Sequence, residues 1–343
     1  MRHDAALRGE AQSATRPLKV VYVNRKRHPQ AFSLEELFHA IATEVSRHAE
    51  VVEYETRGRA KALSDARALR RLDADVYHVT GDITFMALLL PGRKTVVTIH
   101  DIGNFLFGLS GVKRWLYKWV WMVMPIRHAA AATVISEQTS ANIERHLGVP
   151  RRRLRVIDNC YRPIFRPVPR PFADGCPVVL QVGTQSYKNV PRLLQALTGL
   201  KVRLVVVGRL DAALQRAIGE SGIEVENRVG ITNEALYELY VGCDIVSFVS
   251  IGEGFGMPII EAQAVGRPVI TANVSPMSDV AGNGACLVDP LDVGSIRAGL
   301  ARILADPEYR RDLVEGGLQN VVRFSPERIA AQYLALYREV ARP

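Results

Sequence analysis

The stretch DIVSFVSIGEGFGMPIIEA (244–262) joins a strand pattern to a helix pattern through a glycine-rich turn. Its first part, DIVSFVS (244–250), is a mostly apolar run of the kind that forms a strand buried in a parallel sheet. Pro258 suits the start of a helix, and the glycines before it let the backbone approach a ligand closely. A strand, a glycine turn and a helix N-terminus in this order predict an anion site.

Two carboxylates accompany this predicted anion site. Glu253 lies on the turn, and Glu261 lies one turn into the helix. Neither suits contact with a phosphate, but each can accept hydrogen bonds from paired hydroxyls. A nucleotide sugar, with its diphosphate between a ribose and a hexose, satisfies all three features. The alternative is an ordinary strand–turn–helix in which Glu261 only complements the helix dipole.

The same alternation of strand and helix patterns runs through the chain. Continuous apolar strands separated by helices predict an α/β protein with two Rossmann-like, doubly wound domains that face a cleft. The expected strands are 18–24, 51–55, 75–80, 94–100, 131–136, 154–158, 177–183, 201–208, 223–227, 244–250, 267–272 and 284–289.

Length and composition predict where the domains divide. A chain of 343 residues is long for one core, and RPIFRPVPRPFADGCP (162–177) has the proline-rich composition of a linker. The expected units are a disordered leader, an N-terminal acceptor-side domain, a C-terminal donor domain and a C-terminal helix that packs back on the N-terminal domain. Their predicted bounds are 1–16, 17–165, 166–324 and 325–343.

Charge and cysteine usage restrict the location and the partners. Residues 1–170 hold 28 basic and 16 acidic side chains, a net charge of +12, whereas residues 171–343 carry −3. A nucleic acid, an anionic membrane or a solvated arginine-rich face each accounts for this basic half. The four cysteines are far apart and form no zinc or disulfide pattern, which favours a reducing cytoplasm. We find no signal peptide and no run of about 20 apolar residues that would span a bilayer.

Further candidate site residues follow other predicted strands. Lys188 and Asn189 come after the strand that ends at Gly183, where Lys188 suits a diphosphate and Asn189 suits a helix N-cap. Arg209 follows the next strand and is a second candidate cation. A solvated loop lysine is the alternative for Lys188.

A polar pair, His100–Asp101, ends the strand KTVVTIH (94–100) in the first half. Its position predicts an acid/base or hydroxyl-binding site facing the cleft. A buried structural histidine is the alternative.

These motifs together resemble the retaining glycosyltransferases of family 4, which have two Rossmann-like domains in the GT-B fold. The resemblance covers about residues 75–340 and is most specific in the E-x7-E motif, Glu253 to Glu261. It is supported by VGTQSYKN (182–189), NEALYELYVGCDIVSF (233–248) and VVTIHDIGN (96–104).

The resemblance implies sugar transfer from a nucleotide-diphosphate sugar to a glycan or lipid-linked hydroxyl acceptor, without a cofactor. Glu261 would hold the ribose, Glu253 would face the donor sugar, and Lys188 would neutralise the leaving phosphate. His100 would reach the donor sugar from the other domain. The remaining implied contacts are backbone amides of Gly254, Phe255, Gly256 and Met257 at the diphosphate, and the stretch at Arg228 and Val229 at the base.

The sequence departs from the family pattern at three places. Thr184, Ser186 and Tyr187 occupy a turn where relatives often carry an arginine. The loop after the first strand has no glycine, so acceptor binding there would rest on Arg25, Lys26 and Arg27. Asp279 stands where glutamate is usual.

Two further patterns have competing interpretations. Asp73-Ala74-Asp75 matches the DXD metal motif of another glycosyltransferase fold, and we interpret it as chance and expect no metal. The segment VKRWLYKWVWMVMPIRH (112–128) is interpreted as a core helix, while peripheral contact with an anionic membrane is left open.

Other functions stay as alternatives. They are a nucleotide-sugar epimerase, a sugar-nucleotide-binding protein without catalysis and a basic nucleic-acid binder. An epimerase needs acid/base groups at the sugar carbon, and no interleaving of aromatic and basic residues suggests single-strand binding. A retaining glycosidase also uses two carboxylates but has no need of a phosphate loop.

Overall fold

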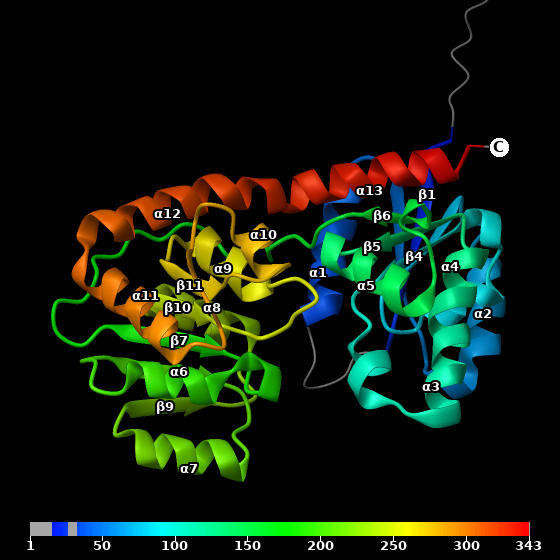
Figure 1. Ribbon diagram of the computed structural model, residues 1–343. Helices are drawn as coiled ribbons and strands as arrows, with labels where there is room; N and C mark the ends of the chain where they lie inside the picture. The colour runs from blue at the N-terminus through cyan, green and yellow to red at the C-terminus, as the bar shows by residue number, and fades with distance from the viewer. Residues whose placement is uncertain (1–15, 27–32, 343) are drawn as a thin grey trace, which may run out of the picture.

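The computed structural model describes residues 16–26 and 33–342 and contains two parallel sheets side by side (Figure 1). The expected leader therefore lies outside the described residues, apart from Arg16. The first sheet has the order β2-β1-β3-β4-β5-β6, and the second has the order β12-β11-β10-β7-β8-β9. All pairings within them are parallel, and the prediction of two doubly wound α/β domains is confirmed.

Each predicted apolar run forms a strand. The strands are β1 Lys19–Asn24, β2 Glu50–Glu55, β3 Val76–Val79, β4 Thr95–Ile99, β5 Ala131–Val134, β6 Leu154–Val156, β7 Val178–Val182, β8 Arg203–Val207, β9 Glu224–Arg228, β10 Ile245–Phe248, β11 Val269–Ala272 and β12 Cys286–Val288. The helices are α1 Ser33–Val45, α2 Ala62–Arg70, α3 Gly111–Tyr117, α4 Met124–His128, α5 Glu137–Leu147, α6 Val190–Leu197, α7 Ala212–Ser221, α8 Asn233–Gly242, α9 Met257–Val265, α10 Met277–Ala281, α11 Val293–Ala305, α12 Pro307–Val321 and α13 Pro326–Val340.

The central strands are mostly apolar because helices cover both faces of each sheet, whereas the edge strands β2 and β9 carry exposed charged residues (Figure 1). On β1, Val21 and Val23 belong to one buried cluster, whereas Val20 and Tyr22 belong to another on the opposite face. Successive side chains of a strand point to opposite faces, so a strand covered on both sides gains from apolar residues at every position.

The chain passes between the sheets twice, along residues 157–177 and again between α12 and α13. Helix α12 packs on α9 of the second sheet, and α13 packs on α1 of the first (Figure 1). Tyr337 of α13 contacts the Nδ1 atom of buried His78 at 2.7 Å, and the Nε2 atom of His78 lies 2.7 Å from Thr98. This buried polar network fixes α13 to the N-terminal sheet.

The strand orders place one switch point in each sheet. In the second sheet, β8 and β9 extend from one side of β7, and β10 then pairs with the other side. In the first sheet, β2 and β3 flank β1 in the same way. Ligands of open α/β sheets bind beyond the carboxyl ends of the strands at such points.

The segment 112–128 is helical as expected, but it does not pack in the core along its whole length. It comprises α3, a π-helical stretch η5 (Lys118–Val123) and α4. Met122 and Val123 are buried, but Val112 and Trp115 of α3 are 81% and 61% exposed. The expectation is therefore wrong for α3. None of the helices in the described ranges is both long and apolar enough to cross a bilayer.

Candidate active site

The switch point of the second sheet brings Lys188 and Glu253 together. Lys188 follows β7 and Glu253 follows β10, and the Nζ atom of Lys188 lies 2.8 Å from Oε1 of Glu253. The ammonium also lies 4.5 Å from the ring centroid of Phe248. Gly183 makes this possible, because its φ is +95° and a Cβ there would lie 2.8 Å from Cε of Lys188. A side chain at position 183 would push Lys188 out of place.

The contact between Lys188 and Glu253 is an ion pair that lacks the alignment of a hydrogen bond. Both side chains are largely buried, at 12% and 13% exposure, so solvent only partly screens the attraction between the two charges. The two charges therefore neutralise each other.

The glycine turn leads into α9 as expected. Gly256 precedes the helix with a φ of +126°, in the region that favours glycine, and Pro258 lies in the first turn. Phe255 is buried against Phe324. The amides of residues 254–257 therefore belong to a tightly held loop at a helix N-terminus, next to the Lys188–Glu253 pair.

Glu261 on α9 is buried and already has two partners. Oε1 accepts hydrogen bonds from Arg162 at 2.8 and 3.2 Å, and Oε2 accepts one from the hydroxyl of Tyr240 at 2.9 Å. Burial, followed by the charge of Glu261, raises the pKa of Tyr240 well above its usual range, so Tyr240 remains a donor. Arg162 begins the segment interpreted as a linker, yet its side chain is only 7% exposed.

Arg162 and Tyr240 were missed from the sequence. Proline-rich composition around Arg162 indicates a connection between domains, and nothing in it predicts a buried ion pair. Tyr240 lies on α8 in an apolar pattern that indicates only core packing.

Asn189 occupies the N-cap position of α6 but does not cap the helix as expected. Its backbone is left-handed, with a φ of +62°, and its side-chain amide donates to the carbonyls of Val249 and Pro290 at 3.0 and 2.6 Å. The capping interpretation is therefore wrong. Asn189 instead ties the start of α6 to the loop after β10, next to the ion pair.

The other predicted donor-site residues lie at the open edge beyond β8 and β9. Thr184 donates to the carbonyl of Arg209 at 2.6 Å, while the Arg209 side chain is exposed. Arg228 pairs with Glu226 at 2.5 Å, and Val229 is half exposed.

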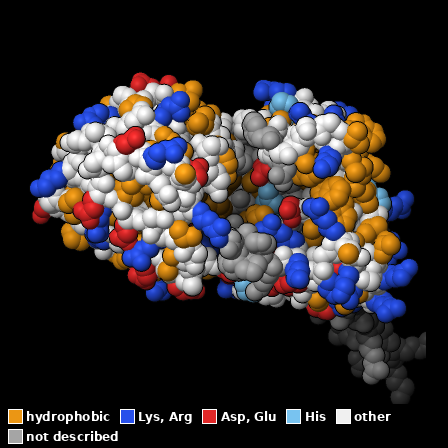
Figure 2. All heavy atoms as spheres, turned by 90° about the horizontal axis from the view of Figure 1, so that it is seen from below, with side chains coloured by type: hydrophobic (Ala, Val, Ile, Leu, Met, Phe, Trp, Pro, Cys, Tyr) orange, Lys and Arg blue, Asp and Glu red, His pale blue; other side chains and the backbone are white. Residues whose placement is uncertain are grey.

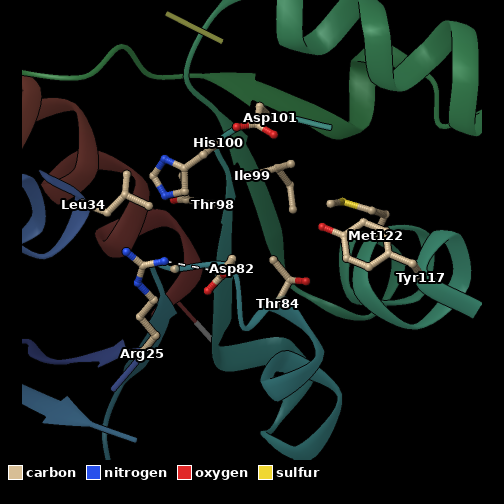
Figure 3. A pocket seen from close by; sticks show the side chains of 11 residues that line it. Arg25, Leu34, Asp82, Thr84, Thr98, Ile99, His100, Asp101, Tyr117 and Met122 are labelled. Atoms are coloured by element: carbon tan, nitrogen blue, oxygen red, sulfur yellow. Dashed lines mark ion pairs between the residues drawn. The ribbon is translucent and has the colours of Figure 1, made fainter. Parts of the chain in front are cut away.

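The switch point of the first sheet forms a pocket at the ends of β1, β3 and β4 (Figure 3). Arg25, which follows β1, pairs with Glu35 and lies 3.7 Å from Asp82, which follows β3. His100 lines the same pocket, Tyr117 and Met122 lie on its far side, and the hydroxyl of Tyr117 points toward it (Figure 3). Of the cations expected to bind the acceptor, Lys26 is exposed and Arg27 lies outside the described residues.

His100 is a neutral hydrogen-bond acceptor in this pocket. Its Nε2 atom lies 2.6 Å from the carbonyl oxygen of Thr80, which can only accept, so Nε2 carries the proton. Burial lowers the pKa of His100, and Nδ1 is buried without a partner among the described residues. Asp101 does not pair with His100, because its Oδ1 accepts from the amide of Gly103 at 2.8 Å.

The two lobes meet across a furrow whose rim carries basic and acidic side chains (Figure 2). Gly254, on the loop of Glu253, lies against the end of β4: a Cβ there would be 3.0 Å from the carbonyl oxygen of His100. The donor-side loop and the N-terminal pocket are therefore neighbours in space.

The DXD residues hold no common site. Asp73 is exposed and lies 3.8 Å from Lys94, whereas Asp75 accepts from the backbone of Lys19 and from Arg16. Within residues 16–26 and 33–342, no group of three or more histidine, cysteine or acidic side chains has the arrangement of a metal site.

Two family models match the chain in succession. Glycosyltransferase Family 4 matches residues 20–163, and Glycosyl transferases group 1 matches residues 167–319. The chain belongs to glycosyltransferase family 4. Solved structures share its two-domain GT-B fold: sucrose-phosphate synthase from Thermosynechococcus elongatus has a TM-score of 0.71 and 21% identity, covering 94% of this chain and 99% of that one. HepE of Anabaena in complex with UDP-glucose has a TM-score of 0.72 and 16% identity, with 94% and 99% covered.

Curated relatives of this family 4 chain include mannosyltransferases. O-antigen chain mannosyltransferase B of Escherichia coli is 27% identical over 80% of this chain and 76% of that protein. MMP alpha-(1->4)-mannosyltransferase of Mycolicibacterium hassiacum is 33% identical over 44% of this chain and 40% of that protein. The match thus spans well under half of the second relative's length.

Proposed function

We propose that this protein is a retaining glycosyltransferase that moves a hexose from a nucleotide-diphosphate sugar to a hydroxyl acceptor in polysaccharide or lipid-linked glycan synthesis. The observation that carries the proposal is the meeting of Lys188 and Glu253 at 2.8 Å, at the switch point of the second sheet and beside the N-terminus of α9. Mannosyltransferases among the relatives support a hexose, and the UDP-glucose complex of HepE supports a nucleotide-sugar donor.

Lys188 and Glu253 would each bind a different part of the donor, the diphosphate and the sugar. Lys188 would leave Glu253 for the diphosphate and stabilise the charge that develops as the nucleotide departs. Glu253 would turn to the sugar and stabilise its positive charge. The helix N-terminus adds backbone donors and a favourable dipole for the same phosphates.

The carboxylate of Glu261 has one free hydrogen-bond acceptor site, so it could accept from one ribose hydroxyl but not from both. A carboxylate has about four acceptor sites, and Arg162 and Tyr240 already fill three of them. One ribose hydroxyl would bind the remaining site on Oε2. The other hydroxyl would need a different acceptor.

The N-terminal pocket would hold the acceptor. Asp82 and Nδ1 of His100 supply hydrogen-bond acceptors for hydroxyls, and Tyr117 adds a hydroxyl that points toward the pocket (Figure 3).

The reaction can be tested with a panel of nucleotide sugars and methanol or an alkyl mannoside as acceptor, in the presence of EDTA. We expect a glycoside with the same anomeric configuration as the donor, which NMR coupling constants report. We expect EDTA to leave the rate unchanged, because Lys188 and α9 supply the positive charge at the phosphates. A product of inverted configuration, or a rate that depends on added Mg²⁺ or Mn²⁺, would contradict the proposal.

Membrane contact remains a prediction for α3. Its exposed side chains, Val112, Trp115 and Leu116, adjoin the cations Lys113 and Arg114, and Figure 2 shows hydrophobic side chains gathered on this lobe. Apolar and basic groups together favour an anionic surface. Sedimentation with anionic lipid vesicles that is lost in Trp115→Ala would support the contact, and no sedimentation of the unmodified chain would exclude it.

A further inference from the structure

The loop that carries Glu253 contacts the N-terminal domain. The contact lies at the carboxyl ends of β4 and β5. Besides the close approach to the carbonyl of His100, a Cβ on Gly254 would lie 3.3 Å from Cβ of Asp101 and 3.6 Å from Ile135. Ile135 packs in the same buried cluster as Phe255, which follows Gly254. The two domains therefore touch at the residue next to Glu253.

Two buried hydroxyls hold this contact. Ser136 donates to the carbonyl of Gly254 at 2.7 Å, and Thr139 donates to the same oxygen at 3.4 Å. Ser136 is also the N-cap of α5 and accepts from the backbone amide of Thr139 at 3.1 Å. The Oγ atoms of Ser136 and Thr139 also lie 3.0 Å apart, so Thr139 can donate to Ser136 while Ser136 donates to Gly254 of the other domain. Both side chains are almost fully buried, at 5% and 3% exposure.

We propose that Ser136 and Thr139 are positioning residues that latch the two domains together in the arrangement that places Glu253 for transfer. The inference rests on the proposed function of Glu253. The peptide that joins Gly254 to Phe255 is planar, so fixing its carbonyl on the N-terminal side also fixes the Phe255 N–H on the opposite side. The latch thus orients Glu253 and one amide of the predicted diphosphate loop at the same time.

A latch of this kind would oppose motion of the two domains relative to each other. Domains joined by few chain crossings move relative to each other unless their interface is large, and catalytic groups from both sides meet only on closure. A hydrogen bond between buried groups contributes modestly to stability. That strength suits a contact that forms and breaks in every catalytic cycle.

The latch can be tested by small-angle X-ray scattering of the full chain without ligand. We expect Ser136→Ala and Thr139→Val to raise the radius of gyration, while Thr139→Ser, which keeps the hydroxyl, retains the unmodified value. Asp211→Ala, which removes only the N-cap of α7, is the control for a lost cap and should not open the domains. Unchanged scattering in both Ser136→Ala and Thr139→Val would overturn the latch.

Kinetics separate positioning from folding. We expect Ser136→Ala to lower kcat roughly fivefold, the loss expected for one hydrogen bond, with the Kd for the bound diphosphate nucleotide unchanged. Thr139→Ser should keep the kcat that Thr139→Val loses. Equal kcat in Ser136→Ala, Thr139→Val, Thr139→Ser and the control Asp211→Ala would contradict the positioning role. If the unmodified chain binds none of UDP, GDP and ADP, the proposed function fails, and the scattering result alone decides whether the latch exists.

Discussion

Replacing Glu253 with glutamine should nearly abolish sugar transfer and at the same time strengthen the binding of a diphosphate nucleotide. The amide has the shape of the carboxylate but cannot stabilise positive charge on the sugar, so kcat should fall on the order of 10²-fold or more. The same change frees Lys188, which pairs with Glu253 at 2.8 Å in the unliganded chain. A phosphate then no longer competes with Glu253, and Kd should fall about fivefold, the effect of roughly 1 kcal/mol.

The two opposite effects make this variant informative, because a misfolded protein would lose both activities. Isothermal calorimetry with the nucleotide and an assay of product formation measure them separately. Glu224→Gln is a matched control, since Glu224 is an exposed carboxylate at the N-terminal end of β9, whereas Glu253 follows the carboxyl end of β10. Turnover near that of the unmodified chain would remove Glu253 from the catalytic site.

Replacing Lys188 with methionine should cost roughly 2–4 kcal/mol of transition-state stabilisation, or about a 10²- to 10³-fold fall in kcat/KM. Methionine keeps most of the apolar stem that packs near Phe248, so the expected loss comes from the charge. Nucleotide binding should weaken as well, because the cation contacts the diphosphate in both the ground state and the transition state.

Lys201→Met is the control for this change, because Lys201 is exposed in the turn before β8, at the opposite edge of the sheet. The double variant with Glu253→Gln reports whether the two residues act as a unit: strongly non-additive losses are expected for partners in one site. A kcat/KM of Lys188→Met equal to that of Lys201→Met would refute the phosphate role.

The twelve strands could be predicted because a buried strand appears in the sequence as a short run of apolar residues. Each strand lies between helical layers, so apolar runs such as PVVLQVG (177–183) appear wherever a strand passes through the core. The positions of Lys188 and Glu253 after strands were also predictable, since parallel strands bring their carboxyl ends to one edge. The ion pair between Lys188 and Glu253 could not be predicted, because it depends on the order of the strands in the sheet.

Other errors share a physical cause, namely contacts between residues far apart in the sequence. The sequence around Arg162 predicts a linker, but Arg162 lies in a buried ion pair with Glu261. The sequence predicts that Asn189 caps a helix, but its side chain donates hydrogen bonds to carbonyls in two other loops. The segment 112–128 is apolar around most of a helix, yet α3 projects Trp115 into solvent. Ser136 shows the limit most clearly, since nothing in ISEQT (135–139) predicts its contact with Gly254.

The most direct test of the nucleotide-diphosphate site is a thermal-shift screen of the unmodified chain and Lys188→Met against UDP, GDP, ADP and their sugars, without metal. A ligand at about 100 times its Kd stabilises a protein by roughly 2.7 kcal/mol, which gives a clear rise in Tm. We predict that one base produces this rise in the unmodified chain and that Lys188→Met reduces it. No rise with any of these nucleotides, or an equal rise in both proteins, would contradict the site at Lys188, Glu253 and α9.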